Sequence, residues 1–321
     1  MSARRESLRA MSLQPLSAVS LTLQEVDAAA FAAAIGASFA DVGFAVVTDP
    51  GLDPVRVSAA LHAAKALFAL PEAAKRRYLQ PGGKGQRGYT PFGVETAKGA
   101  ASSDLKEFWH VGRDLPPGHP LVALMSPNIW PAEPTGFREA VSWLFAALDT
   151  LGQRVLRAIA LYLGLAEDFF TPAVADGNSV LRLLHYPPLA GPGRAIRAGA
   201  HEDINAITLL LGAEEAGLEI LDRGGAWRPI DPPAGAVVVN IGDMLARLTN
   251  DMLPSTTHRV VNPAPDRQGV ARYSTPFFLH FRPDYVIETL PSCVTPTRPN
   301  RRPEAITADA FLRQRLEEIN L

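Results

Sequence analysis

The sequence has little cysteine, little excess charge and no long apolar run. Its single cysteine, Cys293, excludes an intramolecular disulfide framework, a cysteine-based zinc ribbon and an iron–sulfur cluster held by several thiolates. Such a composition is typical of a reducing cytoplasm, so we expect a cytoplasmic protein. The 31 basic and 33 acidic residues give a formal net charge of −2. This balance argues against nucleic acid and against a polybasic membrane anchor as partners.

No stretch approaches the roughly 18 consecutive apolar residues that a membrane-spanning helix requires. Arg4, Arg5 and Arg9 lie near the start, but no apolar run follows them directly, so we do not expect a signal peptide. Translation could begin at Met1 or at Met11. The expected partner is a small molecule, and the oligomeric state stays open.

The first half of the chain is predicted to be mainly helical. Apolar residues recur at helical spacing over 23–39, 54–70 and 135–163, with Thr135 as the expected N-cap of the last helix. Residues 43–48 form a short β-rich run. Residues 81–106 are rich in glycine and small polar residues, which favours a long exposed loop near a functional site.

After Gly177 the pattern changes to short β-branched or apolar runs between Gly, Pro and Asp turns. Many short strands of this kind are typical of a β-sandwich or barrel. We therefore predict an α+β fold with a mainly β core: a double-stranded β-helix, or jelly roll, with a helical N-terminal region packed on it. The expected divisions are a helical region with one short strand (15–130), core helices (131–175), the jelly roll (176–285) and a C-terminal extension with a helix (286–321).

One short segment has the spacing of a metal site. His201 and Asp203 flank Glu202 just before a predicted strand, so on an extended chain their side chains share one face. His258 opens a later strand and is the best candidate for a third ligand. Two imidazoles and one carboxylate form the facial triad of non-haem Fe(II) enzymes, which leaves coordination positions open. A His-x-Asp pair alone is common, and any of the other histidines could instead be a hydrogen-bonded core residue.

A second pair of residues lies fourteen positions after His258. Arg272 and Ser274 share one face of the next predicted strand. A guanidinium beside a hydroxyl suits a carboxylate, because the planar fork takes both oxygens and the hydroxyl adds a donor. An exposed strand arginine is the structural alternative for this pair.

These segments together resemble a known family, the isopenicillin N synthase-like branch of Fe(II)- and 2-oxoglutarate-dependent dioxygenases. The segments that resemble it are GFAVVTD (43–49), LFALPEAAK (67–75), RGYTPFGVE (87–95), HYPP (185–188), HEDINAITLLL (201–211), NIGDML (240–245), STTHRVVNP (255–263) and RYSTPFFLHF (272–281). Each segment is weak evidence alone, but their order and spacing are specific. On this resemblance 15–130 corresponds to the family's N-terminal region and 176–285 to its oxygenase domain.

The resemblance implies a function and a set of site residues. Iron would be bound by His201, Asp203 and His258, and Arg272 and Ser274 would hold the distal carboxylate of 2-oxoglutarate. Tyr186 matches a family tyrosine that often reaches the same cosubstrate, although Leu184 replaces the asparagine that relatives often have two residues earlier. The implied activity uses O₂ and 2-oxoglutarate to hydroxylate, desaturate or cyclise a small organic substrate. No catalytic side chain beyond the metal ligands is expected.

Four other functions stay open at this point. An oxidase of the isopenicillin N synthase type would keep the iron and take all electrons from its substrate. A zinc hydrolase of the His-Glu-x-x-His type would need histidine where Asn205 stands. Gly83 to Gly88 fits G-x-G-x-x-G, but the strand before and helix after that a nucleotide site requires are missing. A catalytically inactive jelly roll would serve only for binding.

The sequence says least about the substrate. Arg87, Tyr89 and Phe92 in the predicted 81–106 loop, and Phe278 near the cosubstrate strand, are the candidate substrate residues. Basic and aromatic side chains there would suit a small acidic or amino-acid-like substrate, whereas a solvated charge cluster is the structural alternative. Core packing is the alternative for Phe278.

Overall fold

The computed structural model describes residues 16–80, 82, 85–94, 104–188, 197–212, 217–262 and 269–318. Met1, Met11 and Gly83, the first residue of the G-x-G-x-x-G segment, therefore lie outside the described residues. The helices are α2 (Thr22–Val26), α3 (Ala28–Val42), α4 (Pro54–Phe68), α5 (Glu72–Arg76), α6 (Phe137–Tyr162), α7 (Thr171–Val174), α8 (Asp243–Leu248) and α9 (Ala308–Glu318). Among these residues no helix has the length and apolar character needed to cross a membrane.

The strands are short, as the turn-rich second half predicts. They are β1 (Ala18–Ser20), β2 (Phe44–Thr48), β3 (Gly88–Thr90), β4 (Glu107–Gly112), β5 (Val180–Tyr186), β6 (Ala198–His201), β7 (Ile207–Leu211), β8 (Leu218–Leu221), β9 (Trp227–Pro229), β10 (Val237–Ile241), β11 (His258–Val260), β12 (Arg272–Ser274), β13 (Pro276–Leu279), β14 (Val286–Ile287) and β15 (Ile306–Thr307).

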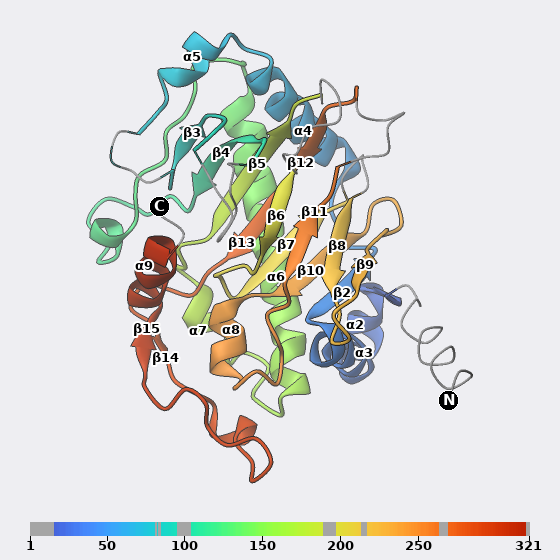
Figure 1. The fold of residues 1–321 in the computed structure, drawn as a ribbon. Coiled ribbons are helices and arrows are strands. Elements are labelled where there is room, and N and C mark those ends of the chain that lie inside the picture. The colour runs from blue at the N-terminus through green and yellow to red at the C-terminus, as the bar shows by residue number, and fades with distance from the viewer. Residues whose placement is uncertain are drawn as a thin grey trace.

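Two mainly antiparallel sheets form the β core. The large sheet has the order β1-β2-β10-β7-β13-β5-β4-β3, with β12 also paired to β5, and the small sheet has the order β6-β11-β8-β9. In Figure 1 the small sheet lies in front of the large one, and α6 runs behind the large sheet. This arrangement confirms the predicted jelly roll with helices packed on it.

The register of the large sheet gives it two different faces, because directly paired residues in antiparallel strands share a face. One face is apolar and buried. It carries Trp109 on β4, Leu181 on β5, Leu209 on β7 and Phe277 on β13. The apolar stripe of α6 packs against it. Its residues at spacings of three and four are buried: Phe137, Val141, Leu144, Leu148, Leu151, Val155 and Ile159. Burial of this kind contributes about 25 cal/mol per Å² of apolar surface.

The opposite face of the large sheet looks toward the small sheet, and we call it the metal-facing face. Successive pairings link Asn240 to Thr208, Thr208 to Phe278, and Phe278 to Val180 across β10, β7, β13 and β5. The same register adds the residues that alternate with Val180 and their partners, which are His110, Phe108, Arg182, Leu184, Tyr186, Arg272 and Ser274. This face therefore carries the polar side chains Asn240, Thr208 and Arg272, whereas Glu107 and His185 are paired on the helix-covered face.

The N-terminal region differs from the prediction in its strands. Residues 16–112 contribute four strands, β1 to β4, and these extend the large sheet at both ends. The sequence indicated only β2. The predicted exposed loop at 81–106 is wrong over 88–90, because β3 pairs with β4 and buries Tyr89 and Thr90, whereas Phe92 and Val94 are exposed as predicted. A three-residue strand is too short to show an alternating pattern.

Helix ends were also predicted imperfectly. The expected helix over 23–39 is divided at Asp27, whose Oδ1 accepts a hydrogen bond from the Ala30 amide at 2.9 Å and caps α3. The N-cap of α6 is Gly136, with φ 80°, rather than Thr135. The division of the chain at 130, 175 and 285 stays a prediction.

Candidate active site

Three side chains meet between the two sheets. His201 ends β6, His258 begins β11, and the two residues are directly paired across these strands. Asp203 follows β6 by two residues. Ligand atoms of all three lie within 4.8 Å of one another. Nε2 of His201 lies 3.9 Å from Oδ1 of Asp203, and Nε2 of His258 lies 3.8 Å from its Oδ2.

The backbone orients both imidazoles. Nδ1 of His201 donates to the carbonyl of Gly199 at 2.7 Å, and Nδ1 of His258 donates to the carbonyl of Thr256 at 3.1 Å. A carbonyl oxygen only accepts, so each Nδ1 carries the proton and each Nε2 presents its lone pair to the common point. The ring centroids are 4.4 Å apart.

The carboxylate of Asp203 is fixed from the large sheet. Its Oδ2 accepts hydrogen bonds from Oγ1 of Thr208 at 2.6 Å and from Nδ2 of Asn240 at 2.8 Å. Nδ2 of Asn205 donates to Oγ1 of Thr208 at 3.1 Å, and so aims the hydroxyl of Thr208 at Asp203. The fixed carboxylate and the two directed nitrogens fit the facial triad that binds Fe(II).

The surroundings of His201 and Asp203 favour the protonation states in which these residues bind a metal ion. Desolvation, together with the nearby His258, lowers the pKa of His201 to about 4. Burial alone would raise the pKa of Asp203, but His258, His201 and the donors Asn240 and Thr208 outweigh it and lower that pKa. At neutral pH the site therefore offers a neutral imidazole and a carboxylate, which are the forms that bind a divalent cation.

Arg272, Ser274 and Tyr186 lie together on the metal-facing face. Arg272 is paired with Tyr186 and Ser274 with Leu184 across β12 and β5. The guanidinium carbon of Arg272 lies 5.3 Å from the centroid of the Tyr186 ring, and the arginine is only 2% exposed. This buried cation with a neighbouring hydroxyl fits the carboxylate of a diacid.

The four residues predicted to contact substrate are placed differently from one another. Phe278 lies on the metal-facing face, directly opposite Thr208. Arg87 is buried against Gly112 and donates to Oδ1 of Asn178 at 2.9 Å. Burial lowers the pKa of Arg87 to about 10. The Arg87 guanidinium lies over Gly112, which is paired with Val180 on the metal-facing face, so its expected contact with the substrate stays a prediction.

Tyr89 lies on the other, apolar side of the large sheet, which does not support a contact with the substrate, whereas the substrate contact expected of the exposed Phe92 stays a prediction. Tyr89 is paired with Trp109 on the apolar face, and its hydroxyl donates to Oε2 of Glu107 at 2.5 Å. The Phe92 ring packs edge-on against His185, with centroids 6.3 Å apart. Successive side chains of the segment 87–90 point to opposite faces of the sheet. The sequence alone does not show which of them points toward the metal ligands.

Other residues of the site were not singled out from the sequence. Thr208 and Asn240 hold Asp203, and the signal that could have found them is their place within the motifs HEDINAITLLL and NIGDML. Asp104 and Lys106 form a buried ion pair of 2.7 Å, and Oδ1 of Asp104 accepts from the amide of Gly199 on β6 at 3.3 Å. The positive charge of Lys106 contributes to the lowered pKa of His201.

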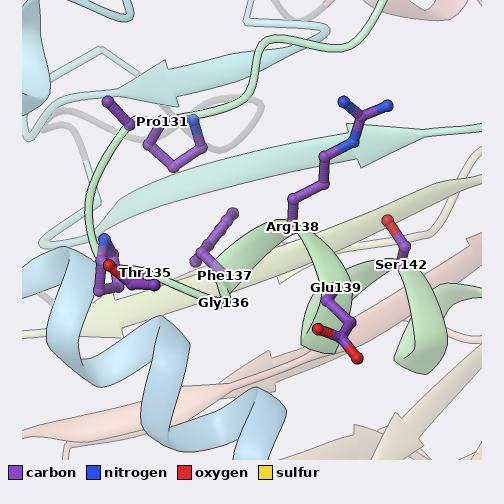
Figure 2. A pocket seen from close by; sticks show the side chains of 9 residues that line it. Pro131, Thr135, Gly136, Phe137, Arg138, Glu139 and Ser142 are labelled. Carbon is purple, nitrogen blue, oxygen red and sulfur yellow. The ribbon is translucent and has the colours of Figure 1, made fainter.

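A hollow on the surface lies apart from these residues. Figure 2 shows it at the start of α6, lined by Pro131, Ala132, Pro134, Thr135, Gly136, Phe137, Arg138, Glu139 and Ser142. It includes none of the triad residues and none of the metal-facing face. We assign it no part in the chemistry.

Comparison with known proteins identifies the family. Residues 14–133 match the N-terminal region of non-haem dioxygenases of morphine synthesis, and residues 177–281 match the 2OG-Fe(II) oxygenase superfamily. The chain belongs to the 2-oxoglutarate- and Fe(II)-dependent oxygenases. It is therefore an oxidoreductase with Fe(II) and 2-oxoglutarate as its cofactors, and the interpretations as a substrate-oxidising iron oxidase, a zinc hydrolase or a binding scaffold are not supported.

Individual oxygenases of this family resemble the chain over most of its length. The 2-oxoglutarate-Fe(II) type oxidoreductase hxnY of Emericella nidulans is 36% identical over 244 residues, covering 73% of this chain and 69% of the relative. A 2OG-Fe(II) oxygenase family structure from Caulobacter crescentus has 62% identity and a TM-score of 0.90, covering 95% of this chain and 99% of that one. A full-length Neurospora crassa protein in complex with alpha-KG and thymine has 30% identity and a TM-score of 0.82, covering 94% and 96%.

Proposed function

We propose that this oxygenase hydroxylates a small organic substrate at a site assembled from His201, Asp203, His258, Arg272 and Ser274. The observation that carries the assignment is the convergence of the triad ligand atoms within 4.8 Å. The bound iron and 2-oxoglutarate supply the oxidising power: O₂ is reduced, 2-oxoglutarate loses CO₂ to give succinate, and a C–H bond of the substrate is oxidised.

The residues of the chain supply binding and orientation. His201, Asp203 and His258 would hold Fe(II), and a set of three protein ligands leaves coordination positions for the cosubstrate and O₂. Arg272 and Ser274 receive the distal carboxylate of 2-oxoglutarate, so the cosubstrate enters in one orientation. The ring of Tyr186 covers the guanidinium of Arg272 and keeps water from it.

The substrate is proposed to be a small molecule that binds beside the triad along the metal-facing face. The complexes of the Neurospora crassa relative with thymine and with 5-formyluracil support a substrate of this size. Hydroxylation is the expected outcome, and desaturation or ring closure are the related outcomes of the same chemistry. We also propose a cytoplasmic location, which is supported by the single buried cysteine.

Anaerobic titration of the protein with Fe(II) and then 2-oxoglutarate tests the site assignment. A visible absorption band should appear only when both are present. Admission of O₂ should then give succinate, slowly without substrate and faster with it. Absence of both the band and the succinate would contradict the assignment, and normal behaviour of His258→Ala would remove that residue from the triad.

A further inference from the structure

The strand that carries the proposed cosubstrate residues is short and is paired along one edge. β12 has three residues, and among the residues that the structure describes it pairs only with β5. Its outer residues, Arg272 and Ser274, lie on the metal-facing face. Backbone pairing of three residues on one side holds a strand weakly. The contacts of the middle residue, Tyr273, therefore contribute to how firmly Arg272 and Ser274 are placed.

Tyr273 lies on the helix-covered face of the sheet and stacks on His185. The two residues are directly paired across β12 and β5, and their ring centroids are 4.9 Å apart with 16° between the ring planes. Two residues of α4 cover this pair. The Phe68 ring stacks on His185 with 5.6 Å between centroids, and Nζ of Lys65 lies 5.4 Å from the centroid of the Tyr273 ring. Stacked rings restrict each other's orientation, so the His185 ring holds Tyr273 against the sheet.

The His185 ring is itself fixed by a buried carboxylate. On the side away from β12, His185 is directly paired with Glu107 on β4, and Nδ1 of His185 donates to Oε1 of Glu107 at 2.7 Å. The second oxygen of Glu107 accepts from Lys75 and from Tyr89, which prevents the carboxylate from turning away from the imidazole. Glu107, His185 and Tyr273 thus form one row of side chains across β4, β5 and β12.

We propose that His185 is a positioning residue for 2-oxoglutarate binding and acts through Tyr273 on Arg272 and Ser274. The row of side chains on the helix-covered face holds β12 against β5, and this keeps the two residues that flank Tyr273 in place on the metal-facing face. Neither His185 nor Tyr273 touches the cosubstrate, because both side chains leave the sheet on the opposite face. This inference rests on the proposed function, because it needs a carboxylate bound at Arg272.

Calorimetric titration of the Mn(II)-loaded protein with 2-oxoglutarate provides the test, since Mn(II) in place of Fe(II) allows binding to be measured without turnover. His185→Leu and Tyr273→Leu each remove the stack. Each should raise the dissociation constant for 2-oxoglutarate by about 3- to 10-fold, the usual contribution of one pair of aromatic rings. The affinity for Mn(II) alone should stay at the wild-type value, because the three metal ligands are not on the helix-covered face.

Further variants show whether the two rings act together. His185→Leu combined with Tyr273→Leu should bind 2-oxoglutarate no more weakly than either single variant, because each of them has already lost the stack. His185→Asn keeps a donor for Glu107 without the ring, so it should resemble His185→Leu and guards against a folding defect there. His185→Phe keeps a ring without the donor and should have a smaller effect. Tyr285→Leu is the matched control, because Tyr285 is also half-buried against a ring, that of Phe281 at 4.7 Å, but lies beyond β13.

The outcomes separate this inference from the function on which it rests. Unchanged 2-oxoglutarate affinity in both His185→Leu and Tyr273→Leu would overturn it. So would a double variant whose effect is the product of the single effects, or a loss of Mn(II) affinity as large as the loss of 2-oxoglutarate affinity, because either result indicates a general effect on the fold. Wild-type protein that fails to bind 2-oxoglutarate in the presence of Mn(II) would instead contradict the proposed function itself.

Discussion

Nδ2 of Asn240 donates to Oδ2 of Asp203 at 2.8 Å, although the two residues are 37 positions apart. The contact joins β10 of the large sheet to the loop that follows β6 of the small sheet. With the Thr208 hydroxyl it holds Oδ2, so the carboxylate is oriented before any metal binds.

Loss of this orientation should weaken the metal site. We expect Asn240→Leu and Thr208→Val each to raise the dissociation constant for Fe(II) by about 10- to 100-fold, because partners of metal ligands commonly contribute that much. Calorimetric titration with Fe(II) or Mn(II) measures it. Thr150→Val on the exposed side of α6 is the control, and unchanged affinity in both site variants would show that Asp203 needs no such support.

Removal of a ligand should have a larger effect than removal of its support. His201→Ala and Asp203→Ala are expected to lose iron-dependent succinate formation, because two remaining ligands hold Fe(II) poorly. The exposed His62→Ala, on α4, should behave like the wild-type protein in the same assay. Full turnover by either triad variant would mean that the metal lies elsewhere.

The cosubstrate residues can be tested separately from the metal. Arg272→Ala removes a charge-assisted contact worth about 1.5–3 kcal/mol, so the KM for 2-oxoglutarate should rise steeply while Fe(II) affinity changes little. Arg282→Ala is a suitable control, since Arg282 pairs at the surface with Asp284. A KM for 2-oxoglutarate that stays at the wild-type value would exclude Arg272 from the site.

A buried carboxylate beneath the sheet should govern acid stability. Glu107 accepts hydrogen bonds from Lys75 at 2.7 Å, from Tyr89 at 2.5 Å and from His185 at 2.7 Å. Burial raises the pKa of Glu107, but these three donors and the charge of Lys75 lower it overall. A lowered folded-state pKa stabilises the fold above the unfolded pKa, and this contribution is lost as the pH falls through the folded-state value.

Substitution of Glu107 leaves Lys75 buried without its carboxylate. Glu107→Gln should therefore lower the free energy of unfolding by about 3–5 kcal/mol at neutral pH. The difference from the wild-type protein should shrink in acid, because Glu107 is protonated there in both folded and unfolded chains. Urea unfolding at several pH values measures this, with the exposed Glu72→Gln as control; a difference that does not vary with pH would argue against the charge as its cause.

The C-terminal helix α9 is also connected, through Asp243, to the metal ligand Asp203. Nη2 of Arg315 on α9 lies 3.1 Å from Oδ2 of Asp243, and the amide of Asp243 donates to the carbonyl of Asp203 at 2.7 Å. Arg315→Ala should weaken Fe(II) binding by a few-fold, whereas Arg313→Ala, in an exposed pair with Asp309 on the same helix, should not. Equal effects of the two variants on Fe(II) affinity would show that the contact between Arg315 and Asp243 does not support Asp203.

The sequence predicted the chemistry of the site better than the surroundings of that chemistry. His201, Asp203, His258, Arg272 and Ser274 could be proposed because each stands at a strand end or alternates along one strand, where spacing decides which side chains share a face. Tyr89 could not be placed from the sequence, because its side of the sheet depends on the pairing of β3 with β4. Asn240 supports Asp203 through a contact between distant strands, which no local pattern displays.

The two histidines of the triad are each anchored to a carbonyl of their own chain two residues earlier. Their direction is thus set by local backbone and not by the identity of the ion between them. Divalent ions of the first transition row bind such nitrogen and oxygen donors in the order set by their own chemistry, with Ni²⁺ and Cu²⁺ above Fe²⁺. We therefore expect purified protein to carry whichever of these ions its surroundings supply. Its iron content would then depend on the metal ions available in the cell and not on a preference of the three ligands for iron.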